Sequence, residues 1–277
     1  MSGDPSLRFG SSHDPILQTQ LFVYPAFNFQ VGMLLPQELI DEIFSYLPPS
    51  DPQTIRNLSL VAKSWVHCSQ KRLFHTVSIS QSTYNSWVDS ISPANLELLH
   101  HVRSLTYTID PTAWVPGYRI DSLGDYLPSF RNLESLVLSS MDLPPAITQQ
   151  VENFSAFRHT LSSLSLWSCY VSSGALITLV NYFPNLTDLQ LRAPKHKTDY
   201  MPFPPLSRPL RGRLSVQTFR RHDLPVLDRL SDLPPDLDEL VVGGAAIDMS
   251  ISYDYTVATY AGSVQRLRLL HGFRRKP

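Results

Sequence analysis

The side chains suited to acid–base or metal chemistry occur without the partners that such chemistry needs. His67 and Cys68 are neighbours in the sequence. A Cys–His nucleophile requires side chains that face each other, whereas neighbours on a helix diverge by about 100°. His100, His101 and His196 lack partners at the spacing of a metal site. We therefore expect no catalytic residue and no bound metal, and we expect Cys68 to be a small buried hydrophobe.

The motifs that bind cofactors or carry a nucleophile are also missing. The sequence contains no Gly-x-Gly-x-x-Gly pattern, no P-loop and no Gly-x-Ser-x-Gly elbow. The pair Gly243–Gly244 is typical of a turn after a strand. The sequence thus favours a non-catalytic protein without a cofactor over an enzyme.

The composition indicates a folded and nearly neutral chain. The 277 residues are 43% hydrophobic, include 2 cysteines and carry a net charge of −1. This balance does not favour binding to nucleic acid or to an anionic membrane. No apolar run reaches the roughly 18 residues of a membrane span, and residues 1–20 lack a signal-peptide pattern. We expect a protein of a reducing compartment, cytoplasmic and/or nuclear, with a poorly ordered leader at residues 1–32.

A repeat runs through most of the chain. Eight six-residue windows begin 25 to 31 residues apart, and their first, fourth and sixth positions are apolar in 23 of 24 cases, the exception being Arg211. The windows are FHTVSI (74–79), VRSLTY (102–107), LESLVL (133–138), LSSLSL (161–166), LTDLQL (186–191), RGRLSV (211–216), LDELVV (237–242) and VQRLRL (264–269). Alternate residues of a strand point to opposite faces. Each window is therefore predicted to be a short strand that buries one face.

The spacing of the windows predicts how the units assemble. A period in the twenties leaves room for one strand, a turn and a helix, and such a unit cannot bury its apolar face alone. We therefore expect a solenoid of short parallel strands with helices on its outer face. The windows resemble the LxxLxL strands of the leucine-rich repeat family over residues 74–270. The Asn or Cys that usually follows the strand in that family is mostly absent.

The segment LLPQELIDEIFSYL (34–47) predicts an amphipathic helix with a wide apolar stripe. Pro36 suits the first helical position, and acidic residues in the first turn suit the helix dipole. Asp51 and Pro52 predict the start of a second helix, whose apolar residues recur as far as Trp65. About 40 residues in two or three short helices cannot bury all of this surface. Part of it must face the rest of the chain, and part is available to a partner.

This front segment resembles the F-box, which has an LPxELxxxIxxYL helix followed by an LxxVxxxW pattern. The matching residues are Leu35, Pro36, Glu38, Leu39, Ile43, Leu47, Leu58, Val61 and Trp65. Ala62 stands where the family usually has Cys or a similar small residue, which is a mild departure. The order of segments resembles fungal F-box proteins with degenerate leucine-rich repeats. It divides the chain into the leader 1–32, an F-box-like helical domain at 33–73 and a repeat domain at 74–277, an α+β protein overall.

The F-box resemblance implies a non-catalytic subunit of a Skp–cullin–F-box ubiquitin ligase. Such a subunit binds a Skp-type adaptor, and through it a cullin, while its second domain holds a protein substrate for proteasomal degradation. The residues expected to form the adaptor surface or its support are Leu35, Pro36, Ile40, Ile43, Leu47, Val61 and Trp65. In an alternative interpretation Leu39, Leu58 and Trp65 are core residues only. In another, the protein is a leucine-rich-repeat scaffold whose N-terminal helices cap the solenoid.

Substrate contacts are expected on the concave strand face, at the third, fifth and seventh positions of the repeats. The candidate residues are Trp167, Gln190, Arg192, Arg213, Arg266 and Arg268. Trp167 is the best single candidate because an exposed aromatic residue often anchors a ligand. The arginines could hold an acidic or phosphorylated segment, or they could belong to an ordinary solvated face.

Overall fold

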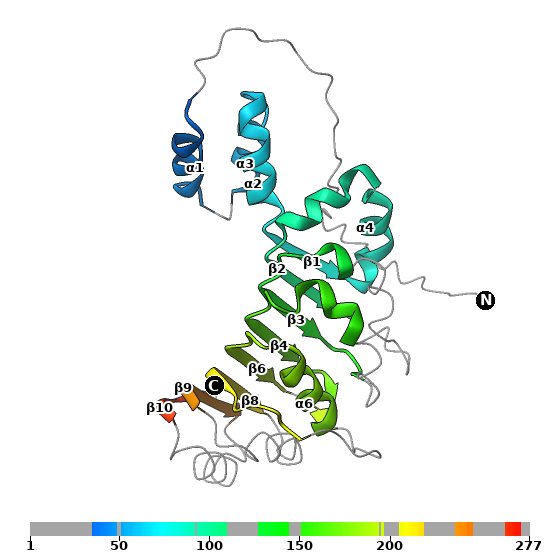
Figure 1. The fold of residues 1–277 in the computed structure, drawn as a ribbon, viewed down its shortest axis with the longest axis vertical. Coiled ribbons are helices and arrows are strands. Elements are labelled where there is room, and N and C mark those ends of the chain that lie inside the picture. Colours follow the sequence, from blue (N-terminus) through cyan, green and yellow to red (C-terminus); the bar gives the residue numbers. More distant parts are fainter. Residues whose placement is uncertain are drawn as a thin grey trace, which may run out of the picture. The chain divides into compact units, whose positions relative to one another are not determined.

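The computed structural model describes residues 35–48, 51–91, 93–109, 127–143, 151–193, 195–196, 205–218, 236–245 and 264–272. All of them belong to the compact unit Leu34–Pro277. The leader expected at residues 1–32 lies outside the described residues. The fold is a set of N-terminal helices followed by a parallel sheet (Figure 1).

Helices open the described part of the chain. Their bounds are Gln37–Ser45 for α1, Pro52–Leu58 for α2 and Lys63–Leu73 for α3. Pro36 was expected in the first turn of α1, but its ψ of 142° is extended and it is the N-cap residue instead. Asp51 and Pro52 take the predicted places at the start of α2. The Asp51 carboxylate accepts the Thr54 backbone N–H at 3.0 Å.

A turn separates α2 from α3, although the apolar residues from Asp51 to Trp65 predicted one continuous helix. The Ser59 hydroxyl donates to the Arg56 carbonyl at 2.6 Å, which competes with continued helix. Ile55 lies before this break and is buried, whereas Val61 lies in the turn and is 63% exposed. Ile55 and Val61 follow the same helical spacing in the sequence, yet the first is a core residue and the second is a surface residue.

A small core holds the three helices together. It consists of Ile40, Phe44, Ile55 and Cys68. The Trp65 ring packs edge-on against Phe44, with ring centroids 5.8 Å apart. Two helices are also joined by polar contacts, because the Arg72 guanidinium of α3 donates to the Leu47 carbonyl beyond α1 at 2.9 Å.

Each of the eight sequence windows overlaps one strand, which confirms the predicted strands. The strands are β1 (Thr76–Ser80), β2 (Ser104–Thr108), β3 (Ser135–Ser139), β4 (Ser163–Trp167), β6 (Asp188–Arg192), β8 (Arg211–Thr218), β9 (Asp236–Ala245) and β10 (Val264–Gly272). They form one 8-stranded sheet in chain order. Every pairing is parallel. A second, 2-stranded sheet pairs β5 (Tyr170–Val171) with β7 (Lys195–His196).

The described parts of the connections contain less α-helix than expected. Only two of the described connections contain α-helix, namely α4 (Tyr84–Ser90) and α6 (Ser173–Tyr182). The 3-10 segments η1 (Gln81–Thr83) and η2 (Pro93–His101) flank α4 between β1 and β2, and η4 (Leu127–Ser129) and η6 (Val151–Phe157) lie in the next two connections. A 3-10 turn rises more steeply per residue than an α-helix, so it spans the sheet with fewer residues. All lie on one face of the sheet (Figure 1).

The main core lies between the sheet and these connections. The fourth positions of the repeats are at most 1% exposed from β2 to β9, as predicted: Leu105, Leu136, Leu164, Leu189, Leu214 and Leu240. From the helical side, Phe154, Phe157 and Phe183 pack against one another with centroids 5.7 to 6.1 Å apart. Alternation along each strand therefore fixes which side chains face the core.

Backbone hydrogen bonds just before each strand repeat from unit to unit. The Arg103 and Ser104 N–H groups both donate to the His75 carbonyl, at 2.9 and 3.0 Å. The carbonyls of Arg103, Glu134 and Ser162 accept in the same way from the next unit. This doubled contact recurs from β1 to β6 and keeps these strands aligned residue by residue.

The one exception to the apolar pattern has a structural explanation. Arg211 occupies an apolar position of its window, but Leu210 takes the core site instead and is 1% exposed. Gly212 then adopts φ +80°, and pairing with β9 shifts between Gly212 and Arg213. A Cβ at Gly212 would lie 2.2 Å from the Thr187 carbonyl oxygen. Gly212 thus accommodates the irregular window, and any other residue at this position would be strained.

We predict that Gly212→Ala destabilises the protein. Positive φ and the clash with Thr187 together should cost about 2 kcal/mol or more, which lowers the melting temperature by several degrees. The neighbouring Arg211→Ala variant is the control, because Arg211 is exposed and its nearest acidic partner is 3.9 Å away. Circular-dichroism melts would check this. Equal melting temperatures for the two variants would contradict the assigned backbone.

We also predict that Cys169 does not react with thiol reagents in the folded protein. Complete burial raises the pKa of the Cys169 thiol to about 12, and the thiol donates to the Leu138 carbonyl at 3.2 Å. Because the thiolate is the reactive form, iodoacetamide should label Cys169 only after unfolding or as the pH approaches that value. Labelling would be measured by mass spectrometry, with Cys68→Ser simplifying the readout. Rapid labelling at neutral pH would show that this core is open.

Candidate protein-binding surfaces

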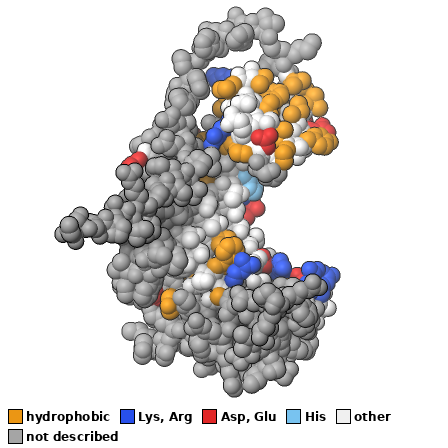
Figure 2. Space-filling model, turned by 180° about the vertical axis from the view of Figure 1, so that it is seen from behind, with side chains coloured by type: hydrophobic (Ala, Val, Ile, Leu, Met, Phe, Trp, Pro, Cys, Tyr) orange, Lys and Arg blue, Asp and Glu red, His pale blue; other side chains and the backbone are white. Residues whose placement is uncertain are grey.

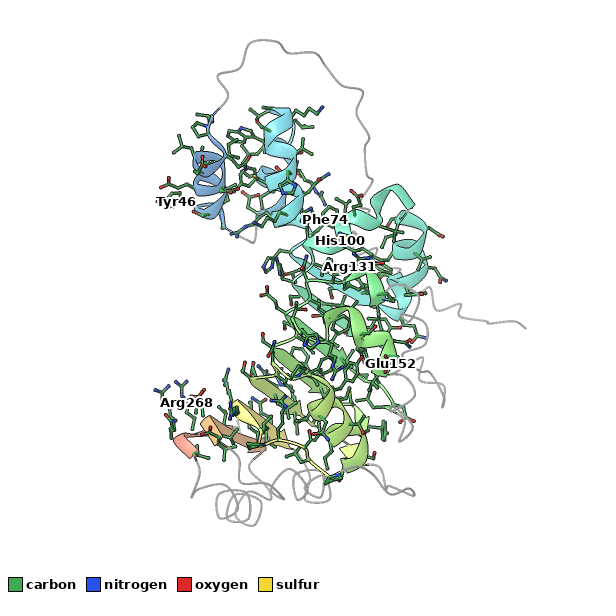
Figure 3. All side chains as sticks on the ribbon, in the orientation of Figure 1. Tyr46, Phe74, His100, Arg131, Glu152 and Arg268 are labelled. Atoms are coloured by element: carbon green, nitrogen blue, oxygen red, sulfur yellow. The ribbon has the colours of Figure 1, made fainter. Side chains whose placement is uncertain are left out.

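Large apolar side chains gather on the outside of the N-terminal helices. We call this surface the helix patch, and its residues are Leu35, Leu39, Ile43, Tyr46, Leu60 and Val61. Leu60 and Tyr46 are 65% and 78% exposed. Figure 2 shows hydrophobic side chains concentrated on this part of the molecule, and Figure 3 shows Tyr46 projecting away from α1. Contiguous exposed apolar surface of this kind marks interaction sites.

The α1 helix contributes to the helix patch because it has two apolar faces. Ile40 and Phe44 point into the core at 0% and 4% exposure, while Leu39 and Ile43, each one residue earlier, stay outside. A helix of nine residues packed on one side cannot bury both faces. The side of α1 that faces away from α3 is therefore left apolar and exposed.

Polar contacts fix the orientation of α1. The Gln37 side-chain amide donates to the Cys68 sulfur at 2.8 Å, and the Cys68 thiol donates to the Asp41 carboxylate at 3.1 Å. The Gln37 amide also donates to the Asp41 carboxylate at 3.2 Å, and the hydrogen bonds from Cys68 and Gln37 lower the pKa of the Asp41 carboxyl group. Burial, reinforced by the Asp41 hydrogen bond, raises the pKa of the Cys68 thiol, so Cys68 is a neutral link between α1 and α3.

The predicted adaptor residues divide into surface and support. Leu35, Pro36, Ile43 and Val61 are exposed. Leu47 and Trp65 are half-buried and pack against the small core, and Ile40 lies within it. Leu39 is 45% exposed, so the alternative that treated it as core only is wrong.

Sequence reasoning left Leu39, Tyr46 and Leu60 out of the predicted site. Leu39 lies in the same i, i+4 stripe as Leu35 and Ile43, which was a usable signal. The exposure of Leu60 follows from the turn between α2 and α3, which only the structure shows. Helical periodicity gave no indication of that turn.

The sheet presents a second surface opposite its helical connections. We call it the open face, and it is formed by the third, fifth and seventh positions of the repeats. Its first four strands carry Ser or Thr at ten of twelve positions: Thr76, Ser78, Ser80, Ser104, Thr106, Thr108, Ser135, Ser139, Ser163 and Ser165. The exceptions are Val137 and Trp167. This half is therefore uncharged and has small side chains.

Trp167 begins the more varied half of the open face. It is half-buried, and the Arg192 guanidinium lies over its ring with the central carbon 4.8 Å from the centroid. Arg192 in turn donates from Nε to the Gln217 side-chain oxygen at 3.0 Å. Trp167, Arg192 and Gln217 are in register on β4, β6 and β8. The aromatic residue is thus part of an organised row and is less exposed than the sequence suggested.

The arginines of the open face have acidic neighbours. Glu239 on β9 contacts Arg213 Nε at 3.0 Å and Arg268 Nε at 2.6 Å. Arg266 pairs in register with Glu239 and is exposed. The Gln190 side chain donates to Asp188 at 2.8 Å. The structure brings all six predicted substrate residues onto one face, and it adds Gln217 and Glu239 as residues that sequence reasoning missed.

Two histidines that are far apart in the sequence are neighbours in the structure. His67 and His101 come together with ring centroids 5.2 Å apart, a contact that the sequence did not indicate. Within the described ranges, no group of three or more His, Cys, Asp or Glu side chains could hold a metal ion. No helix in the described part of the chain is long and apolar enough to cross a membrane.

Comparison with known proteins bears on the helical segment. No curated protein matches the chain. Residues 33–80 match the family model described as F-box-like. The match covers α1, α2, α3 and β1, and it therefore includes the whole helix patch. Residues 33–80 are thus similar to F-box-like domains.

Proposed function

We propose that this protein is the substrate-recognition subunit of a Skp–cullin–F-box ubiquitin ligase. Domains of the F-box family generally bind Skp-type adaptors, and the helix patch gives this domain an apolar surface for that contact. The observation that carries the proposal is that Leu39, Ile43, Leu60 and Val61 are exposed within the segment that matches the family.

The predicted contact residues take distinct roles in this proposal. Leu35, Pro36, Ile43 and Val61 touch the adaptor directly, together with Leu39, Tyr46 and Leu60. Ile40, Leu47 and Trp65 hold α1 and α3 in place behind them. Burying large apolar side chains drives such association at about 25 cal/mol per Å², and a few central residues usually dominate it.

The remaining part of the proposal concerns residues 74–277. We infer that the repeats form a leucine-rich-repeat domain whose open face binds a protein substrate. The adaptor then connects this substrate to a cullin and to the ubiquitin-conjugating machinery. Holding a substrate lysine near activated ubiquitin raises its effective concentration, so this subunit needs no catalytic group. Proteins with F-box domains are typically non-catalytic, and we place this one in the cytoplasm and/or nucleus.

We predict that acidic substitutions in the helix patch abolish adaptor binding. Ile43→Glu with Val61→Glu would force two charges into the apolar contact, and an unpaired charge there costs several kcal/mol. Affinity for a purified Skp-type adaptor should fall at least a hundredfold, measured by pull-down and calorimetry. The circular-dichroism melt should change little because both side chains are exposed.

Two further variants complete this test. Leu35→Ala with Pro36→Ala should also remove adaptor binding, while Ser86→Glu on the exposed side of α4 should leave it intact. If neither the unchanged protein nor any variant binds the adaptor, the result supports the alternative in which the helices only cap a scaffold. If the double glutamate variant binds the adaptor as tightly as the unchanged protein, the helix patch is not the adaptor-binding surface.

A further inference from the structure

Three arginines of the open face have Nε close to an acceptor: Arg192 through a hydrogen bond, and Arg213 and Arg268 through ion pairs. Each is contacted through Nε by an acceptor on the adjoining strand or the next. Arg192 donates to Gln217 at 3.0 Å, and Arg213 and Arg268 lie 3.0 and 2.6 Å from the two carboxylate oxygens of Glu239. The Trp167 ring supports Arg192 from the side of β4. Arg192 is therefore positioned by a hydrogen bond and a ring contact, whereas Arg213 and Arg268 are drawn to one carboxylate by ion pairing.

This arrangement leaves the outer end of each guanidinium available. An arginine has five N–H donors, and a contact at Nε involves only one of them. The two terminal nitrogens form the fork that binds a carboxylate or phosphate through two bonds. The Arg213 and Arg268 side chains are 43% and 57% exposed, while Glu239 beneath them is 14% exposed. Figure 3 shows Arg268 projecting from the face opposite α6.

The charges of this region favour an anionic partner. The open face of β6 to β10 carries Arg192, Arg213, Arg266 and Arg268 against Asp188 and Glu239. Subtracting two acids from four arginines leaves a net charge of +2. Figure 2 shows basic side chains forming a row beside a hydrophobic patch. Exposed ion pairs contribute little to stability, so folding alone gives no reason for this row.

The register of the sheet sets the distance between the basic groups. Three strand spacings of about 4.8 Å separate β6 from β10. Arg192 and Arg268 also differ by two residues along the strand, or about 7 Å. The backbone positions are thus roughly 16 Å apart, and an extended chain covers this distance in four or five residues at about 3.4 Å each.

We propose that the open face between β4 and β10 binds an extended acidic segment of a protein. Two anionic side chains, four or five residues apart, bind Arg192 at one end and the Arg213–Arg268 pair at the other. An apolar side chain next to the first anion contacts Trp167. This inference rests on the proposed function only in taking the segment to be part of the ligase substrate.

Synthetic peptides provide the test. Fluorescent peptides of glycine and serine would carry one leucine and two glutamates separated by increasing numbers of residues. A second series would carry phosphoserine in place of glutamate, and a third would carry glutamine. Fluorescence anisotropy with the full chain, at low and high salt, should show binding of the anionic series with an optimum at four or five residues. The better of the two anionic series identifies the anion.

The variants separate positioning from overall charge. Arg192→Ala and Arg268→Ala should each weaken binding at least tenfold. Gln217→Ala changes no charge but releases Arg192, and should weaken binding severalfold. Glu239→Ala raises the net charge, so charge alone predicts tighter binding, whereas loss of positioning predicts weaker binding. Ser78→Ala on β1 is the control and should have no effect. Melts would establish that each variant is folded.

Several outcomes would overturn the proposal. Equal affinity for the glutamine series, affinity independent of spacing, tighter binding by Glu239→Ala, or no binding of any anionic peptide would each contradict it. Adaptor binding is measured in parallel on the same proteins. If the protein binds the adaptor but no peptide, this inference is wrong and the ligase role stands. If it binds the peptides but not the adaptor, the ligase role is wrong and this inference stands.

Discussion

Residue-by-residue alignment of the parallel strands is the constraint on which the rest of the sheet depends. A slip of one residue would turn every side chain of a strand to the opposite face. The leucines at the fourth positions would then leave the core, and Ser or Arg side chains would enter it. The doubled N–H contacts to carbonyls such as His75 and Glu134 hold this alignment from β1 to β6. Where Arg211 breaks the pattern, Leu210 and Gly212 restore it within two residues.

The same alignment arranges the open face. Trp167, Arg192 and Gln217 are 25 residues apart in successive units, yet they are neighbours across β4, β6 and β8. Glu239 reaches two arginines because β8 and β10 both pair with its strand. A repeat that was shaped by core packing therefore also places polar side chains in fixed rows. Recognition by this face depends on which residues occupy the rows.

The helical segment follows a different rule. Its core is small, and α1 has apolar residues on two faces, so packing against α3 leaves one of them outside. In the sheet, by contrast, the apolar residues at the fourth positions are buried from β2 to β9. The helix patch is thus the part of the described chain where apolar surface lacks a neighbour from the described residues. The match to an F-box-like family model falls on this segment.

The sequence by itself determined the strands, because alternation along a strand and spacing between strands are local properties. It also determined the start of α2, since Asp51 and Pro52 act within one turn. Tertiary structure decided which face of α1 is buried, because Leu39 and Ile40 are equally apolar and only packing against α3 separates them. It decided that Leu127–Ser129 and Val151–Phe157 are 3-10 segments where helical periodicity predicted α-helix. It also decided that Glu239 joins Arg213 and Arg268, because residues 26 and 29 positions away become neighbours only through strand register.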